Sequence, residues 1–354
     1  MSGATPPPVD VSVLVPVYNE AKVIAETFEA MRDQDYDGTV ELLFIDGRSE
    51  DDTVAILERV AGDDPLVRIL DNPGRTIPLA LNIGLAEARG EYVVRMDAHS
   101  VYPRGYIRDG IERLRRGDVE WVSGPPVPYG MTPGSRRVAL ALTSPLGNGG
   151  APKWIPEHGD HDEVELRTTV FAGVWRREVL EAHGGWDEGA AVNEDVELAS
   201  RFVAAGQRIV CVPSMAARYF PRDSLQGVWR QYHAFGYYRC RTATIHPHSL
   251  RRSQLMAPGL VLTGAAAVAP GWLGRLGRTG LIAYAGSVFG ATTGSATLGK
   301  RDLASGLPAI FVTMHVAWGV GFLRGCLRFG VPFGALDQAV LGRRPPDPPR
   351  RIEP

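Results

Sequence analysis

Short apolar runs alternate with segments of helical spacing between residues 11 and 97, and this alternation constrains the fold more than any other feature. The apolar runs are too continuous for strands with one face in water, so they predict strands covered on both faces. The segments between them place apolar residues three and four apart, as amphipathic helices do. The predicted strands are 11–15, 40–46, 66–70 and 91–97, and the predicted helices are 20–34, 50–62 and 76–90. Together they predict βαβ units, hence an α/β domain with a Rossmann-like, mostly parallel sheet.

Three of these strands end in polar clusters, at Pro16–Asn19, Asp46–Asp51 and Asp97–Ser100. Ligands of parallel sheets bind beyond the carboxyl ends of the strands, so three polar clusters on one rim predict a binding site there. In the third cluster, Asp97 and His99 are two residues apart and point to the same side of an extended segment. Such a pair can hold a metal ion and a substrate, or it can simply turn the chain. The two neighbouring clusters favour the site.

A second group of polar residues opens a predicted helix further along the chain. Gly184 and Gly185 interrupt the chain, and Asn193, Glu194 and Asp195 precede an amphipathic stretch. Acidic residues in a first helical turn are stabilised by the helix dipole, so plain capping is one interpretation. The other is a general base, which has to be ionised near neutral pH. The local sequence leaves both open.

The stretch WRQYHAFGYYRCRT, residues 229–242, combines arginines with aromatic residues at helical spacing. One interpretation is a core face with a solvated opposite face. The other is a wall of a sugar site with arginines for phosphate, because the guanidinium fork matches phosphate oxygens.

Composition and the N-terminus exclude several classes of protein. A formal net charge of −2 argues against nucleic acid as a partner. The three cysteines are far apart and predict neither disulfides nor a structural zinc site, as expected of a reduced compartment. The first ten residues lack a basic segment followed by an apolar one, so we expect no signal peptide and a cytoplasmic catalytic part.

The C-terminal third changes character. The stretches 255–273, 281–298 and 307–323 carry no charge apart from His315, and each approaches the ~20 residues of a membrane-spanning helix. Membrane association is the expectation, and a buried soluble helical subdomain is the alternative. Basic residues border every stretch, so they do not select a topology. We therefore expect a catalytic domain over 1–250, membrane-associated helices over 251–330 and a Pro/Arg-rich tail over 331–354.

Five motifs in this order resemble the family 2 glycosyltransferases. They are VSVLVPVYNE, LLFIDGRSEDDT, LALNIGLAEARGEYVVRMDAHS, GGWDE…NEDVELASRFVAAG and WRQYHAFGYYR, and they cover residues 10–245. The resemblance implies the GT-A fold, followed here by a C-terminal apolar helical membrane region. Within the family, the Asp-Ala-His motif, the SPLGNGG loop and the segment MHVAWGVGFLRG resemble the membrane-bound succinoglycan glucosyltransferase group.

The resemblance also implies roles for individual residues. Asp195 matches the catalytic base, with Glu194 supporting it or the acceptor. Asp97 and His99 match the motif that binds a divalent ion, Mn²⁺ or Mg²⁺, and through it the donor diphosphate. The remaining donor-binding residues are expected to be Pro16, Tyr18, Glu20, Asp46, Ser49, Arg75 and Arg239. The acceptor and closing motif is expected to include Trp186, Arg230, Gln231 and Tyr238.

Two departures from the family pattern affect specificity. Gly47 and Arg48 follow Asp46 where many relatives have a second aspartate that contacts uracil, which leaves base specificity open. His99 replaces the second aspartate of the metal motif. Imidazole is neutral and softer than carboxylate, so we expect weaker ion binding and a preference for Mn²⁺ over Mg²⁺.

The sequence therefore predicts an inverting, metal-dependent glycosyltransferase at the inner membrane. It would transfer a hexose, glucose being the expectation, from a UDP-sugar to a hydroxyl of a lipid-linked or growing polysaccharide acceptor, forming a β-glycosidic bond. Three alternatives are open at this point: a polyprenyl-phosphate glycosyltransferase, a nucleotidyltransferase and a non-catalytic membrane scaffold. The expected partners are the nucleotide-sugar donor, the acceptor and membrane lipid.

Overall fold

The computed structural model describes residues 8–150, 163–167, 170–297 and 301–342. The chain separates into two compact units, which are described separately here. The first comprises the described parts of residues 1–127 and 155–219, and the second comprises those of residues 128–154 and 220–347. The helix with the WRQYHAFGYYR motif therefore groups with the C-terminal helices. The functional division expected at residue 250 stays a prediction.

The first unit is built on an eight-stranded sheet with the order β3-β2-β1-β4-β9-β6-β10-β8. Its amino-terminal half has the four strands that the apolar runs predict, all parallel. These are β1 (Val11–Val17), β2 (Val40–Asp46), β3 (Val67–Asp71) and β4 (Tyr92–Arg95), connected by α1 (Ile24–Arg32), α2 (Thr53–Ala61) and α3 (Ile77–Glu87). The predicted alternation is confirmed.

The later strands make the sheet mixed. The helix α4 (Tyr106–Arg115) leads to β6 (Trp121–Ser123), which pairs in parallel with β10 (Ile209–Cys211). The strand β9 (Gly173–Arg176) lies antiparallel between β4 and β6, and β8 (Val164–Glu165) is antiparallel to β10. A separate small sheet has the order β5-β11-β7, formed by Ser100–Val101, Ala217–Tyr219 and Pro126–Pro128.

Side chains on alternate strand positions enter two different cores. Val13 and Val15 pack with α1, α2 and α4 on one face, while Leu14 packs on the other face with α3, α7 (Arg177–Ala182) and α8 (Glu194–Ala204). Both faces of the sheet are thus shielded from solvent, which is the physical reason for the apolar runs.

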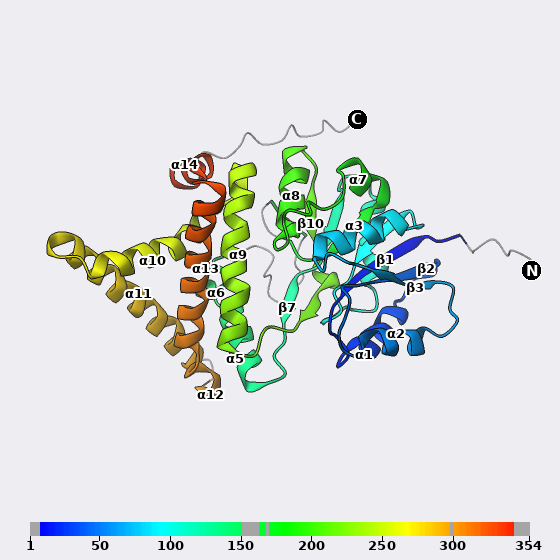
Figure 1. Cartoon of the computed structure of the whole chain (residues 1–354), viewed down its shortest axis with the longest axis horizontal. Coiled ribbons are helices and arrows are strands. Elements are labelled where there is room, and N and C mark those ends of the chain that lie inside the picture. Colours follow the sequence, from blue (N-terminus) through cyan, green and yellow to red (C-terminus); the bar gives the residue numbers. More distant parts are fainter. Residues whose placement is uncertain (1–7, 151–162, 168–169, 298–300, 343–354) are drawn as a thin grey trace, which may run out of the picture. The chain divides into compact units, whose positions relative to one another are not determined.

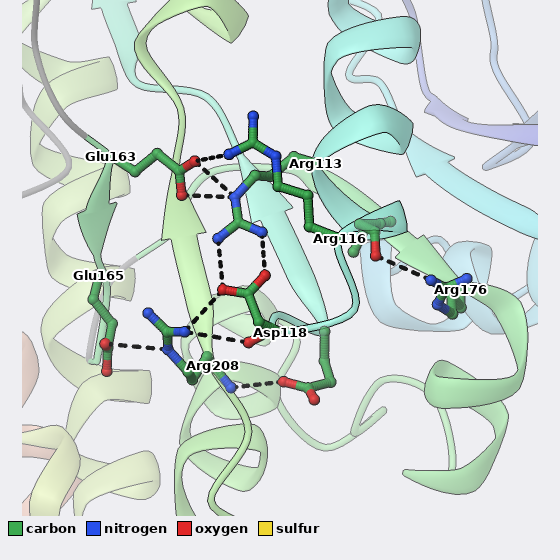
Figure 2. Close-up of polar contacts among 9 residues, drawn as sticks. Arg113, Arg116, Asp118, Glu163, Glu165, Arg176 and Arg208 are labelled. Atoms are coloured by element: carbon green, nitrogen blue, oxygen red, sulfur yellow. Dashed lines mark hydrogen bonds and ion pairs between the residues drawn. The ribbon is translucent and has the colours of Figure 1, made fainter. Parts of the chain in front are cut away.

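An ion-pair network joins the amino ends of β6 and β10 (Figure 2). Arg113 on α4 donates from Nη1 to Asp118 at 2.5 Å and from Nε to Glu163 at 2.7 Å. Arg208 reaches the other oxygen of Asp118 at 3.0 Å and Glu165 at 3.5 Å. Because β6 runs parallel to β1, this network lies at the amino ends of the parallel strands, and the loops of the predicted site follow their carboxyl ends. The network therefore links α4, β8 and the starts of β6 and β10 to one another, and it does not belong to the predicted site.

The second unit is helical. Its long helices are α9 (Leu225–Ile245), α11 (Gly271–Thr297) and α13 (Leu307–Phe329), and its shorter ones are α5 (Pro133–Leu142), α6 (Pro145–Asn148), α10 (Met256–Ala267), α12 (Arg301–Ala304) and α14 (Phe333–Leu341). Helices α9 and α13 lie side by side (Figure 1). A Cβ placed on Gly236 would lie 2.0 Å from the Trp318 carbonyl oxygen, and one on Gly321 would lie 2.0 Å from that of His233. Glycine is therefore required at both positions for this close backbone approach.

Replacing Gly321 by alanine is expected to destabilise the second unit by about 1–3 kcal/mol, because the added methyl group must push α9 and α13 apart. The matched control is Gly290→Ala on α11, where nothing lies within 4 Å of the added Cβ. Melting temperatures of the two detergent-solubilised variants measure the difference. Equal melting temperatures would contradict the close packing of α9 and α13.

One segment within the described residues, Asp302–Phe329, is long and apolar enough to cross a membrane, and half of its most apolar window is buried. Core helices of soluble proteins can share this length and composition. The other two apolar stretches differ from this segment in helix length or composition, and their association with a membrane stays a prediction. The first stretch breaks after α10, whose 12 residues span only ~18 Å. The second lies in α11, which opens with Arg275 and Arg278 and is rich in glycine and alanine. Residues 343–354 of the predicted tail lie outside the described residues.

Candidate active site

The loops that follow β1 and β2 are hydrogen-bonded to each other. Asn19 N donates to Ser49 Oγ at 2.9 Å, and Glu20 N donates to Thr53 Oγ1 at 2.8 Å. The Ser49 hydroxyl in turn donates to Asp46 Oδ1 at 2.6 Å. The predicted donor-binding residues Asp46 and Ser49 are thus hydrogen-bonded to each other and, through Asn19, to the loop that follows β1. Pro16 lies within β1, where it is partly buried.

Tyr18 and Arg75 are brought together although 57 residues separate them. The Arg75 guanidinium lies over the Tyr18 ring, 5.5 Å from its centroid, and donates to Glu50 at 3.0 Å. The neighbouring Arg48 instead makes a two-pronged contact with Asp71, at 3.1 and 3.0 Å. Arg75 therefore faces Tyr18, which is one of the predicted donor-binding residues, whereas Arg48 contacts Asp71 at the end of β3.

Backbone strain concentrates at this rim. In the described part of the chain, five residues other than glycine have positive φ: Asn19, Arg48, Arg75, Ala172 and Asn193. The first three follow β1, β2 and β3, Ala172 precedes β9, and Asn193 directly precedes α8. Because β9 runs antiparallel to β4, its first residue, Gly173, pairs with Arg95 at the carboxyl end of β4. Such conformations are costly and tend to cluster at functional sites.

Arg95 connects the predicted metal motif to the predicted base helix. Its Nε donates to Asp97 Oδ1 at 2.9 Å, and its Nη1 donates to Glu194 Oε1 at 2.8 Å. The Arg95 and Glu194 side chains are each 7% exposed, whereas Asp97 retains 15%. Two predicted site segments that are 99 residues apart in the sequence therefore meet through one buried guanidinium.

The charges of this cluster influence one another. Burial acts to lower the pKa of Arg95, but the charges of Asp97, Glu194 and Asp195 outweigh it and raise the pKa above its ordinary value. Burial acts to raise the pKa of Asp97, yet the interaction first with Arg95 and then with His99 holds it below the usual value. Burial raises the pKa of Glu194, while Arg95 opposes this rise and Asp195 adds to it. Asp97 is thus kept as a carboxylate, as an ion ligand must be.

The Asp97–His99 turn is fixed by neighbours on both sides. Asp97 N donates to the Tyr102 hydroxyl at 2.9 Å, and Thr27 Oγ1 donates to the Ala98 carbonyl at 2.7 Å. The His99 ring remains 44% exposed, and its Nδ1 lies 3.4 Å from Glu20 Oε1. A carboxylate beside a ligating imidazole commonly orients it, so Glu20 can fix the ring through Nδ1.

These residues fit a divalent ion that is shared with a substrate. The described residues contain no group of three or more His, Cys, Asp or Glu side chains placed to hold a metal alone. One ionised carboxylate and one accessible imidazole, Asp97 and His99, leave the remaining positions to donor phosphate oxygens and water, as magnesium sites in phosphoryl-handling enzymes do. The donor set therefore matches binding of the ion together with the diphosphate.

Asp195 is partly exposed beside the buried Glu194, and its Oδ1 accepts a 2.8 Å bond from Val196 N. Trp186 is different: its indole is 2% exposed, in the core beside Trp175 with ring centroids 5.7 Å apart. Its backbone N donates to Asn82 at 2.8 Å. The first unit thus brings the predicted base to the rim and places Trp186 inside. An acceptor role for Trp186 stays a prediction.

The remaining predicted residues lie on α9 in the second unit. Arg230 is exposed, and Gln231 and Tyr238 are partly buried. Arg239 is 4% exposed and donates to the Ser249 carbonyl at 3.4 Å, within the helical unit. Their roles toward donor and acceptor stay predictions.

The sequence did not single out Arg95, Tyr102 or Thr27. Arg95 did leave a signal, since it interrupts an otherwise apolar run between Val94 and Met96 on a strand predicted to be covered on both faces. A charge at such a position requires a partner. Tyr102 and Thr27 left none, because their contacts depend on how the loops fold back.

Comparisons with known proteins show the family of this chain. The model of the family described as glycosyl transferase family 2 matches residues 12–177. The chain is 32% identical over 331 residues to the succinoglycan biosynthesis protein ExoA of Rhizobium meliloti (strain 1021), covering 90% of this chain and 95% of that protein. It is 23% identical over 235 residues to a dolichyl N-acetyl-alpha-D-glucosaminyl phosphate 3-beta-D-2,3-diacetamido-2,3-dideoxy-beta-D-glucuronosyltransferase of Methanococcus voltae, covering 64% of this chain and 71% of that protein.

A solved structure is similar in fold. The mannosyltransferase PcManGT from Pyrobaculum calidifontis, in complex with GDP-Man and Mn²⁺, aligns with a TM-score of 0.51 at 22% identity, covering 90% of this chain and 87% of that one.

The chain belongs to the family 2 glycosyltransferases, and it is therefore an enzyme with the GT-A type of fold. The narrower resemblance to the succinoglycan group is also confirmed, by the similarity to ExoA over nearly the whole chain. Family membership sets aside the nucleotidyltransferase and the non-catalytic scaffold.

Proposed function

We propose that this enzyme is an inverting, metal-dependent hexosyltransferase that moves a sugar from a nucleotide donor to a hydroxyl of a lipid-linked or growing polysaccharide acceptor. Glucose from UDP-glucose is the expected donor sugar, and a β-glycosidic bond is the expected product. The similarity to a succinoglycan biosynthesis protein supports a polysaccharide acceptor. The observation that carries the proposal is the contact of Arg95 with both Asp97 and Glu194, because it joins the donor motif to the base helix.

In the proposed reaction, the Asp195 carboxylate takes the proton of the acceptor hydroxyl. The hydroxyl oxygen forms a bond to the anomeric carbon, and the bond from that carbon to the donor diphosphate breaks, leaving its electron pair on the nucleoside diphosphate. A single displacement inverts the centre, so an α-linked donor gives a β-glycoside. Asp97 and His99 would hold the divalent ion, whose charge offsets that of the departing diphosphate.

Ground-state binding would be provided by the strand-end loops. Tyr18 and Arg75 lie together and offer a ring face and a guanidinium, while Asp46 and Ser49 form the adjoining polar wall. An aromatic face suits a base, and hydrogen-bonding groups suit a ribose. The donor would thus bind across the ends of β1, β2 and β3.

We place the enzyme at the inner face of the cell membrane. The apolar segment Asp302–Phe329 supports association with lipid. A lipid-linked acceptor would then be met at the surface where it resides, with the catalytic domain in the cytoplasm, where nucleotide sugars are made.

The test is a release assay for nucleoside diphosphate. Detergent-solubilised enzyme is screened with UDP-glucose, UDP-galactose, UDP-GlcNAc and GDP-mannose, with Mn²⁺, Mg²⁺ or chelator, and with a membrane lipid extract. We expect turnover of one donor that requires both a divalent ion and the extract. Turnover with purified polyprenyl phosphate alone would favour the polyprenyl-phosphate glycosyltransferase instead. No release from any donor would overturn the proposal.

A further inference from the structure

Arg95 is as deeply buried as its partner Glu194 at the candidate site, and no step of the proposed reaction uses it. It lies on β4 with a side chain that is 7% exposed, between strands β1 and β9. Its two contacts use two different nitrogens, Nε for Asp97 and Nη1 for Glu194. One side chain therefore fixes a donor-motif carboxylate and the first turn of α8 at the same time.

Stability alone does not explain this arrangement. Buried ion pairs rarely stabilise a fold more than apolar side chains of similar volume, because desolvation offsets their attraction. Arg113 offers a direct comparison within the same unit. It is equally buried, at 7%, and also contacts two carboxylates (Figure 2). It lies at the amino ends of β6 and β10, away from the carboxyl-end loops. The two arginines differ in their location, because only Arg95 contacts residues of the predicted site.

We propose that Arg95 is a positioning residue for glycosyl transfer, which holds Asp97 and the Glu194–Asp195 turn at a fixed separation. The inference rests on the proposed function of this site. The planar guanidinium provides donors at fixed angles, whereas a lysine ammonium is a point charge on a flexible stem. Lysine at this position keeps the charge but not the two directed contacts. A misplacement of ~1 Å between reacting groups can reduce a rate ~10²-fold.

The experiment compares Arg95→Lys and Arg95→Gln with Arg113→Lys in the full-length, detergent-solubilised enzyme. Turnover is measured per folded protein, with folding checked by gel filtration and thermal melting. We expect Arg95→Lys to lower kcat by about 30- to 100-fold, with the KM for the donor changed by less than about threefold. Arg113→Lys should lower the melting temperature and leave kcat near the wild-type value. Arg95→Gln keeps the inference testable if the lysine variant does not fold.

A double-mutant cycle with Asp195→Asn separates positioning from general loss of structure. If Arg95 acts by positioning the base, Arg95→Lys should change the residual rate of the Asp195→Asn enzyme by less than about threefold. An equal loss in both backgrounds would overturn the inference, and so would an Arg95→Lys enzyme with wild-type kcat. A wild-type enzyme that releases no nucleoside diphosphate would instead overturn the proposed function, and this inference with it.

Discussion

Replacing Asp195 by asparagine should reduce turnover by about 10³-fold while donor binding changes little, since removal of a general base typically costs 10²–10⁴ in rate. Asparagine has nearly the same shape and can still accept the bond from Val196 N, but it cannot take the acceptor proton. Asp195 is partly exposed at the rim, so it can meet an acceptor, unlike the buried Glu194 beside it. The measurement is kcat for nucleoside diphosphate release, beside donor affinity from equilibrium binding.

The matched control is Glu178→Gln. Glu178 is an exposed acid in the first turn of α7, so its replacement also removes a carboxylate from a helix N-terminus. Loss of the dipole interaction costs each helix at most about 1 kcal/mol, so the two variants should have similar melting temperatures. The control should keep wild-type kcat. If Asp195→Asn retained more than about a tenth of the wild-type rate, far more than loss of a base allows, Asp195 would not be the base.

The part of the fold that follows local rules could be predicted from the sequence. Strands β1, β2 and β4 are mostly apolar because both of their faces are covered, while β3 is only partly buried. The helices between them begin and end near the predicted positions. The mixed half of the sheet could not be predicted in the same way. Strands such as β8 and β9 are two and four residues long, and their direction depends on distant pairing partners.

The sequence predicts which residues belong to the candidate site, but not the hydrogen bonds and ion pairs that connect them. The strand-end rule brings Asp46, Asp97 and their neighbours to one rim without knowledge of any contact. The contact of Glu194 with Arg95 spans 99 residues, and only the folded chain shows it. For Trp186 the motif predicts an acceptor contact, but the sequence does not show how deeply the residue is buried, and in the structure it is 2% exposed.

The three apolar stretches of the C-terminal third differ in hydropathy for a physical reason. All three are nearly free of charge, but glycine, serine and threonine contribute little hydropathy. Helix α11 is 27 residues long but is not apolar enough to be a candidate membrane span. The most apolar window of Asp302–Phe329, in contrast, has a mean hydropathy of 1.6. Residues Val268–Pro270, which separate α10 from α11, also divide a stretch that appears continuous when charges alone are counted.

Replacing Asp97 by asparagine should lower kcat/KM by about 10²-fold or more, the scale of effect expected when a charge-stabilising group in an active site is lost. Asp97 is the carboxylate proposed to bind the ion with His99, and the pKa of its carboxyl is held low by Arg95 and His99 against the effect of burial. Chelation of the wild-type enzyme should produce a comparable loss. Chelator added to the Asp97→Asn enzyme should have little further effect, because both changes remove the same contribution. Independent, multiplying losses would show that Asp97 does not act through the ion.

Replacing His99 by aspartate tests the identity of the ion. The wild-type enzyme should require a higher concentration of Mg²⁺ than of Mn²⁺ for half-activation, because imidazole favours the softer ion. Aspartate adds a hard oxygen ligand and a negative charge, so it should reduce this concentration ratio by about tenfold, equivalent to roughly 1.4 kcal/mol. His183→Asn is the control: the His183 ring lies against Phe202, with Nδ1 2.8 Å from the Val179 carbonyl, and its loss should leave the ratio unchanged. Equal half-activation of the wild-type enzyme by both ions at low micromolar concentration would contradict a role for the imidazole in selecting the ion. In that case the histidine would serve the turn after β4, and Asp97 alone would hold the ion against the donor.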